Sequence, residues 1–416
     1  MMNRRVVVTG TGVVSPIGND VPAYWENLLA GVCGIDTIKS IPVDDLPVKV
    51  AGEVKDFDPS AYGIEPQFVR KQDRFTVFAV AAARQAMDES GLSTAEEGGN
   101  IDSMRLGVYV GSGIGGFTTQ VRETEKIIKD GPKWVSPLFI PTMIANIAAG
   151  NIAIRHNACG PCLPVVTACA TSTHAIGEAF RAIKHGYADA IIAGGTEAVL
   201  LPLSIAGFAN AKALSRCEDP KRASLPFNKN RSGFVMAEGA AILVLEEYEH
   251  AVARGANIIA EVCGYGNTCD AHHVTAPRPD GKTQAAAVRQ ALDEAGYTSD
   301  DVLYINAHGT GTALNDPAET AAFKLALGDD AYKAHVSSIK GAIGHMLGAA
   351  GAVEAVAAVL ALKNGIVPPT IGLDEVDPEC DLDYTPNTPV EAALTIAISD
   401  SLGFGGHNGC VAFRKY

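Results

Sequence analysis

The stretch Val165-Val166-Thr167-Ala168-Cys169 runs directly into Ala170-Thr171-Ser172-Thr173-His174-Ala175. An apolar, β-branched run that meets small residues at helical spacing is typical of a buried strand followed at once by a helix. We expect the strand at Leu163–Thr167 and the helix at Thr173–His185. The sequence therefore predicts a strand–turn–helix unit that holds Cys169 at its turn.

The same alternation of apolar runs and Ala-rich segments continues along the whole chain. Strands that alternate with helices predict an α/β fold with a mostly parallel sheet, covered by helices on both faces. The other strands are expected at Arg5–Gly10, Arg105–Gly111, Ala190–Ala193, Ala240–Leu245, Ile258–Val262 and Val302–Asn306, and the other helices at Phe75–Ser90, Thr283–Ala295 and Gly351–Lys363.

A second segment repeats the pattern of the first. Val336-Ser337-Ser338-Ile339-Lys340 leads through a Gly-rich turn into a helix that ends Lys363-Asn364-Gly365, much as the first helix ends Lys184-His185-Gly186. Two similar halves that meet near Gly255 would account for the length of 416 residues. Chance can produce this much similarity, so the repeat is a hypothesis at this point.

The composition excludes several classes of protein. The chain has 33 Lys and Arg against 47 Asp and Glu, a formal net charge of −14, and 47% hydrophobic residues. This balance is typical of a globular protein, and its acidity argues against a dedicated nucleic-acid binder. No apolar run reaches the ~18 residues of a membrane span, and the N-terminal apolar stretch is too short for a signal peptide.

Nine scattered cysteines, in a chain long enough to build a core, favour free thiols and a cytoplasmic location. Cys159-Gly160-Pro161-Cys162 matches a thioredoxin dithiol, but it precedes an expected strand instead of opening a helix, so disulfide exchange is the weaker interpretation. Cys410 could be a second reactive thiol, although its surroundings look like a buried strand. No residue spacing matches a metal site, and we expect neither a metal nor a cofactor.

Three side chains are the main candidates for catalysis. Cys169 stands at the expected N-terminus of a helix, where unpaired N–H groups and the helix dipole lower a thiol pKa; the alternative is a small buried apolar cysteine. His308 follows an expected strand and His345 lies in a second Gly-flanked loop. Together they predict a nucleophile-plus-imidazole site. Gly403-Phe404-Gly405-Gly406 could present a backbone N–H to an oxyanion, or be only a tight connection.

These motifs, in this order, resemble the β-ketoacyl-acyl carrier protein synthases of the thiolase-like superfamily, most closely those of the elongating type. The resemblance covers essentially the whole chain. It implies a duplicated thiolase-like fold of five layers, αβαβα, and a homodimer. The two halves would be residues 1–255, which carry Cys169, and residues 256–416, which carry His308 and His345.

The resemblance implies a decarboxylative Claisen condensation, in which malonyl-acyl carrier protein extends an acyl chain held on Cys169. His308 and His345 would stabilise the enolate, and Lys340 would supply positive charge nearby. Backbone N–H groups of Cys169 and Phe404 would hold the acyl oxyanion. The implied substrate-binding residues are Thr310, Thr312, Thr275, Ile114 and Gly405, and the implied supporting acids, which could equally be solvated carboxylates, are Asp316, Glu319 and Glu354.

The implied partner, an acyl carrier protein, is itself acidic, so docking on this acidic chain requires a local basic patch. We expect no nucleic acid and no membrane as partners. The residues that match the family's docking segments are Arg70, Lys71, Arg74, Lys133 and Arg216.

The same residues distinguish the condensing activity from those of related proteins. A biosynthetic thiolase would need a second catalytic cysteine, and an initiating synthase would have Asn in place of His345. A type II polyketide ketosynthase keeps the same three catalytic residues and stays open as an alternative. A non-catalytic acyl-binding or scaffold protein would leave those residues without a role. Gly311, Asp400 and Leu402 depart from the common family residues, and we expect them to affect the substrate channel and the gating loop.

Overall fold

The computed structural model describes residues 4–95 and 97–416, and within them nine strands form one large sheet. The strands of this sheet are β1 (Val6–Val14), β4 (Leu106–Gly111), β5 (Ala190–Glu197), β6 (Gly239–Glu247), β7 (Ala260–Cys269), β8 (Leu303–Asn306), β9 (His335–Ser337), β12 (Ile396–Gly403) and β13 (His407–Lys415). Two short hairpins pair β2 (Asp36–Thr37) with β3 (Val50–Ala51) and β10 (Ile366–Val367) with β11 (Val390–Glu391).

The helices lie between these strands along the chain. They are α1 (Val21–Leu29), α2 (Pro66–Val69), α3 (Arg74–Ser90), α4 (Phe117–Asp130), α5 (Phe139–Met143), α6 (Ile147–Arg155), α7 (Thr171–Lys184), α8 (Pro202–Asn210), α9 (Pro220–Ala223), α10 (Tyr248–Ala253), α11 (Lys282–Ala295), α12 (Asn315–Leu327), α13 (Lys340–Ile343) and α14 (Ala350–Asn364). Every helix and strand predicted from the sequence has a counterpart here except the strand at Leu163–Thr167.

The strand order shows an internal duplication. The sheet runs β4-β5-β6-β1 and then β7-β13-β12-β8-β9. Read outward from β1 and from β7, the two series match: β6 and β13 are antiparallel to their neighbours on both sides, and β5 and β12 are parallel to β4 and β8. A short antiparallel ladder between Val6–Val8 and Ala260–Val262 joins the two series.

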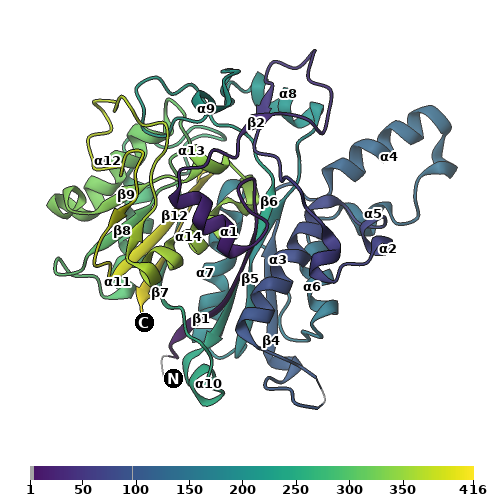
Figure 1. Cartoon of the computed structure of the whole chain (residues 1–416), viewed down its shortest axis with the longest axis horizontal. Helices are drawn as coiled ribbons and strands as arrows, with labels where there is room; N and C mark the ends of the chain where they lie inside the picture. Colours follow the sequence, from purple (N-terminus) through teal and green to yellow (C-terminus); the bar gives the residue numbers. More distant parts are fainter. Residues whose placement is uncertain (1–3, 96) are drawn as a thin grey trace.

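Five layers stack across the molecule, as predicted. The helices α7 and α14 contact strands of both series and form the middle layer. Helices α3 and α6 cover the outer face of the first series, and α11 and α12 lie over the second (Figure 1). The segment Leu347–Asn364, which includes α14, is apolar and long enough to cross a membrane, but it is 89% buried inside the molecule and serves as a core helix.

Glycines allow the first strand of each series to approach its outer helix closely. A Cβ at Gly10 or Gly12 of β1 would stand 2.0 Å from a carbonyl oxygen of α3. A Cβ at Gly264 or Gly266 of β7 would stand 2.0 or 1.8 Å from a carbonyl oxygen of α11. The same two-residue glycine spacing therefore sets the same helix–sheet contact in both halves.

Two sequence-based predictions about the sheet are wrong. Within the described residues, three strand pairs of the large sheet are parallel and five are antiparallel, so the sheet is mixed and not mostly parallel. Residues Leu163–Thr167 form no strand: Cys162 bridges Val108 of β4, but Leu163 and Val166 are 50% and 53% exposed. This segment lies at the outer edge of the first series, where no further strand of the described chain covers it.

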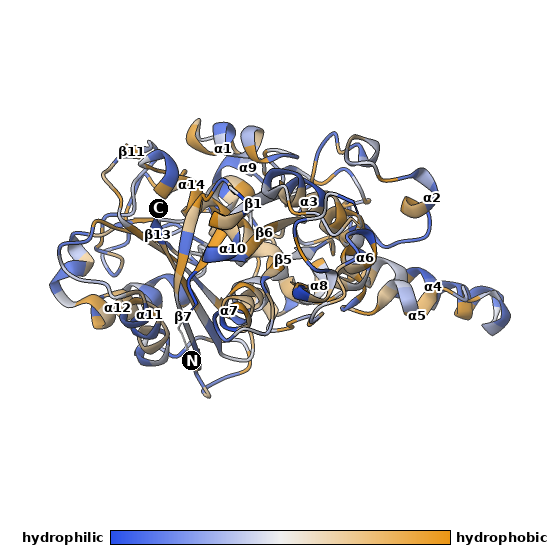
Figure 2. Ribbon diagram, turned by 90° about the horizontal axis from the view of Figure 1, so that it is seen from below, coloured by the Kyte–Doolittle hydropathy of each residue, from blue (hydrophilic) through white to orange (hydrophobic). Residues whose placement is uncertain are grey.

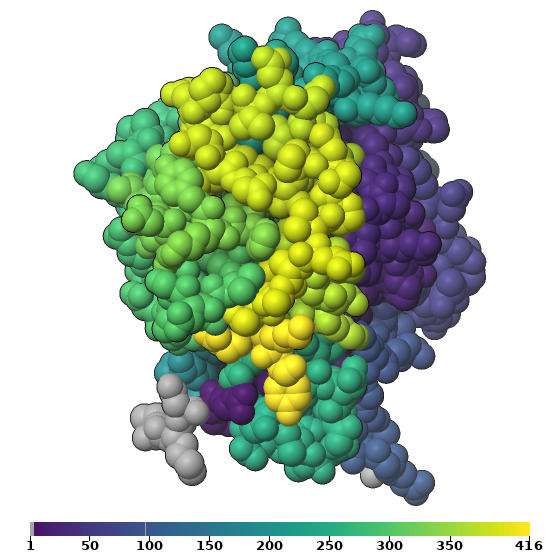
Figure 3. Space-filling view, turned by 60° about the vertical axis from the view of Figure 1, so that its left-hand side comes forward, coloured from purple at the N-terminus to yellow at the C-terminus, as the bar shows by residue number. Residues whose placement is uncertain are grey.

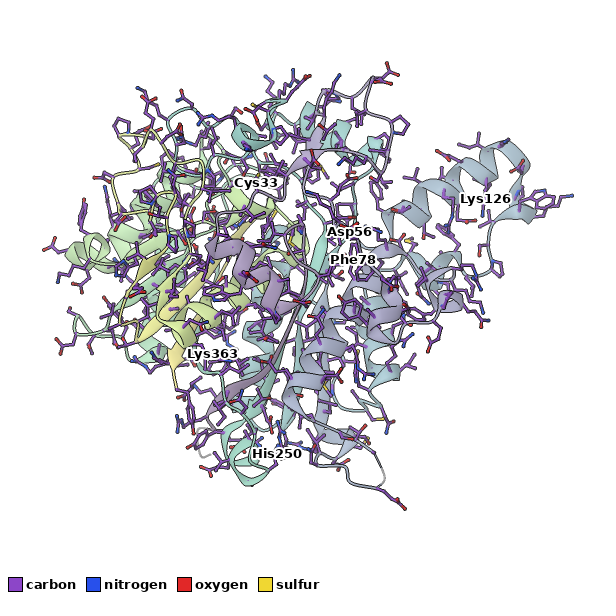
Figure 4. All side chains as sticks on the ribbon, viewed as in Figure 1. Cys33, Asp56, Phe78, Lys126, His250 and Lys363 are labelled. Carbon is purple, nitrogen blue, oxygen red and sulfur yellow. The ribbon has the colours of Figure 1, made fainter. Side chains whose placement is uncertain are left out.

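An arm made of α4, α5 and the turn between them projects from the first half. Figures 1 and 2 show it extending away from the layered body, and Lys126 on α4 marks it in Figure 4. On another face, segments far apart in the sequence lie side by side: residues late in the chain (yellow) adjoin residues of its first part (purple) (Figure 3).

Candidate active site

Cys169 lies on a strained turn at the start of α7. The turn is a single 3₁₀ segment, Ala168–Ala170, and Ala168 has a φ of +53°, which a residue with a Cβ rarely adopts. The backbone N–H of Ala170 donates to the carbonyl of Thr167, so the chain reverses sharply at the cysteine. The predicted turn at Cys169 is present, although extended backbone and not a strand leads into it.

The pKa of the Cys169 thiol is raised to about 12 because burial removes the sulfur from water. The Lys340 ammonium and the backbone N–H of Phe404 act in the opposite direction, toward the thiolate. The prediction that the helix N-terminus gives a net lowering of this pKa is therefore wrong. The resting group is a thiol, and its proton must pass to an acceptor when the sulfur attacks.

His308 follows β8 and is held through its backbone N–H, its carbonyl oxygen and one ring nitrogen. Its backbone N–H donates to Glu319 Oε1 at 2.6 Å, and Lys340 Nζ lies 2.6 Å from its carbonyl oxygen and 3.4 Å from its Nδ1. Lys340 also forms a buried ion pair with Glu354. Since the ammonium has only protons to offer, Nδ1 must accept, and the proton of a neutral ring is then on Nε2.

His345 stands edge-on to His308, with 5.2 Å between the two ring centroids. Its backbone N–H donates to the carbonyl of Val235 at 2.7 Å, and Phe234 packs against its ring. Burial and the nearby Lys340 cation lower the pKa of both imidazoles well below the ordinary value. Both rings are therefore neutral at physiological pH.

One pocket, of about 960 Å³ with its open mouth, brings the predicted residues together. Cys169, His308, His345 and Phe404 line it, and Leu402 lines it as well. The threonines predicted to bind substrate, Thr275, Thr310 and Thr312, also line this pocket.

Phe404 lies in the tight turn between β12 and β13. Its backbone N–H points at the Cys169 sulfur. The N–H of the next residue, Gly405, instead donates to the carbonyl of Val274 at 2.7 Å, and Gly405 does not line the pocket. The turn is thus both a tight hairpin connection and a source of one N–H at the nucleophile. Ile114, the other predicted substrate-binding residue, is also outside the lining.

The predicted acids are fully buried, so the alternative that they are solvated carboxylates is wrong. Glu319 accepts the N–H groups of His308 and Gly309, and Asp316 accepts those of Gly311 and Phe227. Their oxygens therefore hold the backbone of the loop that carries His308 and the two pocket threonines.

Two functional positions were missed or misread in the sequence. The place of Asp400 near the gating loop predicts that it lines the pocket, but it does not. Its side chain is buried, accepts from the Gln284 amide, and accepts the backbone N–H of His308 on Oδ1 at 3.2 Å. Glu197, at the end of β5, was not singled out, although it binds the loops on both sides of Cys169. The available sequence signal for Glu197 was a glutamate at the end of a strand that is otherwise nearly free of polar residues.

The predicted docking residues differ in whether their side chains already have a partner within the protein. Arg70, Lys71, Lys133 and Arg216 are exposed. Arg74 is exposed as well, but it already pairs with Glu238 at 2.8 Å and lies over the ring of Phe78. Lys133 belongs to the projecting arm, so the exposed bases of one chain are distributed over the arm and the body.

The Cys159–Cys162 motif does not open a helix, as a thioredoxin dithiol would. Residues 159–163 run alongside β4, with Val108 N–H bonded to the carbonyl of Pro161 and Leu163 N–H bonded to that of Val108. Both cysteines are free thiols. Cys410 is fully buried in β13, as its surroundings predicted.

Comparison with known proteins gives matches over the full chain. Residues 3–251 match the family described as β-ketoacyl synthase, N-terminal domain, and residues 259–374 match its C-terminal domain. The chain is 49% identical to 3-oxoacyl-[acyl-carrier-protein] synthase 2 of Synechocystis over 99% of this chain and 98% of the relative. It is 47% identical to the protein of that name from Staphylococcus aureus, over 100% and 99% of the two chains.

Solved structures give the same result. One is a type II polyketide ketosynthase in complex with its acyl carrier protein and bound to a hexaketide; it has a TM-score of 0.92 and 34% identity, with 100% of both chains covered. Another, the ishigamide ketosynthase/chain length factor, has a TM-score of 0.91 and 36% identity, again with 100% of both chains covered.

Proposed function

We propose residue roles for this chain, which belongs to the β-ketoacyl synthase family and condenses malonyl-acyl carrier protein with an enzyme-bound acyl chain. It is an acyltransferase of fatty acid elongation that forms 3-oxoacyl-acyl carrier protein. The observation that carries the proposal is the convergence of one thiol, two neutral imidazoles and an inward N–H in one pocket.

In the first half-reaction, the Cys169 sulfur attacks the acyl thioester carbonyl. The new bond joins Cys169 to the acyl carbon, and the bond to the carrier's thiol breaks. The proton of the Cys169 thiol passes to the departing thiolate through the neutral ring of His345, because the thiol is not ionised at rest and Nδ1 of His308 already accepts from Lys340. The N–H of Phe404, which faces the sulfur, and that of Cys169 itself hold the negative oxygen of the tetrahedral intermediate.

In the second half-reaction, malonyl-carrier protein loses CO₂ and its bond electrons form an enolate. His308 and His345 donate their Nε2 protons to the enolate oxygen as charge develops. The enolate carbon then attacks the acyl carbonyl on Cys169, and the Cys169 sulfur departs. Lys340 and Glu354 are positioning residues here, since the ammonium fixes the His308 tautomer and the carboxylate balances its charge.

The threonines at the pocket mouth serve the substrate arm. Thr310 Oγ1 lies 3.0 Å from Thr312 Oγ1, and Thr275 lines the same pocket. Hydroxyl groups in a row suit the amide groups of a pantetheine arm, which both donate and accept hydrogen bonds. Beyond the mouth, the exposed bases Lys71, Lys133 and Arg216 would attract an acidic carrier protein.

A homodimer is supported by the open edge of the first half. Leu163 and Val166 on that edge are about half exposed, and unpaired backbone beside exposed apolar residues is a template for strand pairing. Trp134, Leu138 and Ile140 of the projecting arm are also exposed. A second copy that pairs along this edge would cover both features. We further propose a cytoplasmic location and two structural halves, residues 1–255 and 256–416, within one catalytic unit.

Intact-mass measurement after incubation with acyl-carrier protein tests the nucleophile. The protein should gain the mass of one acyl group, and peptide mapping should locate that group on Cys169. An acyl group on any other of the nine cysteines would contradict the assignment. A set of acyl donors from short to long, with product masses, would separate fatty acid elongation from the extension of polyketide chains.

A further inference from the structure

His174 is a buried histidine that the proposed reaction does not use. It lies on α7, the helix that Cys169 precedes, is 3% exposed, and stands outside the lining of the pocket. Its Nδ1 is 2.9 Å from the hydroxyl oxygen of Thr167. Its ring is edge-on to those of Tyr265 and His407, with 6.2 Å between the centroids in each pair. The ring therefore lies between the turn that carries Cys169 and the strands β7 and β13.

The two nitrogens of this ring face two different elements. Burial lowers the pKa of His174 to about 4, so the ring carries a single proton at physiological pH. The backbone carbonyl of Asn408, on β13, favours that proton. Since Nδ1 faces the Thr167 hydroxyl, the proton is on Nε2, and Nδ1 accepts from the hydroxyl. His174 thus directs one nitrogen at the turn before Cys169 and the other at β13.

The contact between α7 and the β12–β13 hairpin is close at two neighbouring residues. A Cβ at Gly409 of β13 would stand 2.7 Å from Nε2 of His174, so the absence of a side chain there lets the ring reach the strand. The hydroxyl of Thr173, the preceding residue, lies 2.6 Å from that of Ser401 on β12, the strand partner of Gly409. The helix therefore contacts both strands of the hairpin whose turn holds Phe404.

The same hairpin lies directly on the turn of Cys169. A Cβ at Gly403 would stand 2.6 Å from the carbonyl oxygen of Thr167 and 3.4 Å from the backbone nitrogen of Cys169. The N–H of Thr167 donates to the Thr171 hydroxyl on α7 at 2.9 Å. Thr167 is therefore the residue at which the turn, the helix and the hairpin meet.

The two N–H groups of the proposed oxyanion hole come from these two separate elements. That of Cys169 belongs to the turn, and that of Phe404 belongs to the hairpin. Such donors act only when they stand about 2.7–3.1 Å from the oxygen that becomes charged. A small shift of the turn against the hairpin would therefore weaken the hole.

We propose that His174 is a positioning residue that holds the turn of Cys169 against the β12–β13 hairpin and so keeps the two oxyanion N–H groups at their spacing. The proposal rests on the proposed function, in which Cys169 is the nucleophile. His174 acts through Thr167 and touches no reacting atom. It should therefore matter for acyl transfer, which passes through a tetrahedral intermediate on Cys169, and not for CO₂ release, which does not.

Two substitutions remove the same contact from opposite sides. Thr167→Val keeps the branched shape and the backbone contacts but removes the hydroxyl that donates to Nδ1. His174→Gln places an amide toward the position of Nε2 and leaves no acceptor at that of Nδ1. The double variant completes a mutant cycle. A matched control is Thr9→Val, which removes an equally buried hydroxyl whose partner, Glu246, lies outside the pocket.

The readouts are the rate at which Cys169 gains acyl mass, by quenched flow, and the rate of CO₂ release from malonyl-carrier protein without an acyl donor. We expect acylation roughly tenfold slower in each single variant, the factor that loss of one hydrogen bond allows. The double variant should be no slower than the slower single one, because both changes remove one contact. CO₂ release should stay within about twofold of wild type, and Thr9→Val should keep both rates.

Unchanged acylation in a folded Thr167→Val variant would overturn the proposal. So would CO₂ release that falls by the same factor as acylation, or single effects that multiply in the double variant. If His174→Gln does not fold, the two rates of Thr167→Val decide alone. The mass of wild-type acyl-enzyme separates this failure from that of the proposed function. An acyl group absent from Cys169 refutes the mechanism, whereas one present on Cys169 with unchanged variant rates refutes only the role of His174.

Discussion

The two halves share one strand order but end in different edges. In the second half, β9 pairs with β8, and its Val336 N–H donates to the carbonyl of Asp383, so later chain covers that edge. In the first half, the equivalent position is the extended segment at Leu163–Val166, with about half of each of these two side chains exposed. A duplicated fold thus covers one edge within the described chain and leaves the other uncovered, and it is at this uncovered edge that we propose the second copy to pair.

The same contrast appears in the catalytic residues. The histidines of the second half are buried; Glu319 and Lys340 hold His308, and the carbonyl of Val235 holds the backbone of His345, which suits groups that must stay neutral and fixed. Cys169 of the first half lies on a turn with a positive φ at the start of α7. The comparison suggests a division of labour: the first half carries the acyl chain, and the second half handles the charge of decarboxylation.

The largest effect is expected from charging the open edge. The double substitution Leu163→Asp and Val166→Asp would bury two carboxylates in the proposed dimer interface. We therefore expect the dissociation constant of the dimer to rise roughly a thousandfold or more. Light scattering after size-exclusion chromatography measures this. Leu325→Asp, at an exposed leucine of the second half, is the control and should leave the mass unchanged. If the double variant keeps the molar mass of the wild type in solution, this edge is not part of a dimer interface.

A smaller effect is expected at the basic surface. Reversing Lys71, Lys133 and Arg216 to Glu should raise KM for carrier-bound substrates roughly tenfold and flatten its salt dependence, because exposed charges act mainly on encounter. Turnover of a small pantetheine thioester should stay near wild type. If both substrates lose activity together, the three residues serve the fold and not docking.

The smallest effect concerns pH. Because the pKa values of His308 and His345 are depressed, both rings stay neutral as pH falls from 8 to 6, and acyl transfer should not titrate in that range. Removing the pair with Lys340→Met and Glu354→Gln takes away the cation but leaves burial, the larger cause of both depressed pKa values. The acid limb of acyl transfer should therefore move toward neutral pH without reaching that of a free imidazole. Stopped-flow or quenched acylation rates check this, and an unchanged acid limb would contradict it.

Much of the fold could be predicted because buried strands and Ala-rich helices leave strong local patterns. The direction of a strand leaves no such pattern. β1 and β6 have only antiparallel neighbours and β4 has a parallel one, yet all three strands are buried on both faces. Leu163–Thr167 has the composition of a strand, but hydrogen-bonding partners decide whether a strand forms, and no further strand of the described chain pairs with this segment.

The site was predicted to a similar extent. Cys169, His308 and His345 stand out because reactive side chains beside glycines are uncommon, and the pocket contains all three. The net pKa of the thiol could not be predicted, since burial is a property of the packed molecule. Glu197 and Asp400 act on backbone N–H groups of distant loops, and such contacts have no spacing in the sequence.

Measuring the two half-reactions separately in Cys169→Ala and His308→Ala tests the division of labour most directly. Cys169→Ala should release CO₂ from malonyl-carrier protein and never gain acyl mass. His308→Ala should gain acyl mass on Cys169 but release CO₂ at least ~10²-fold more slowly than wild type. Acyl mass retained by Cys169→Ala, or both half-reactions lost together in each variant, would contradict the account.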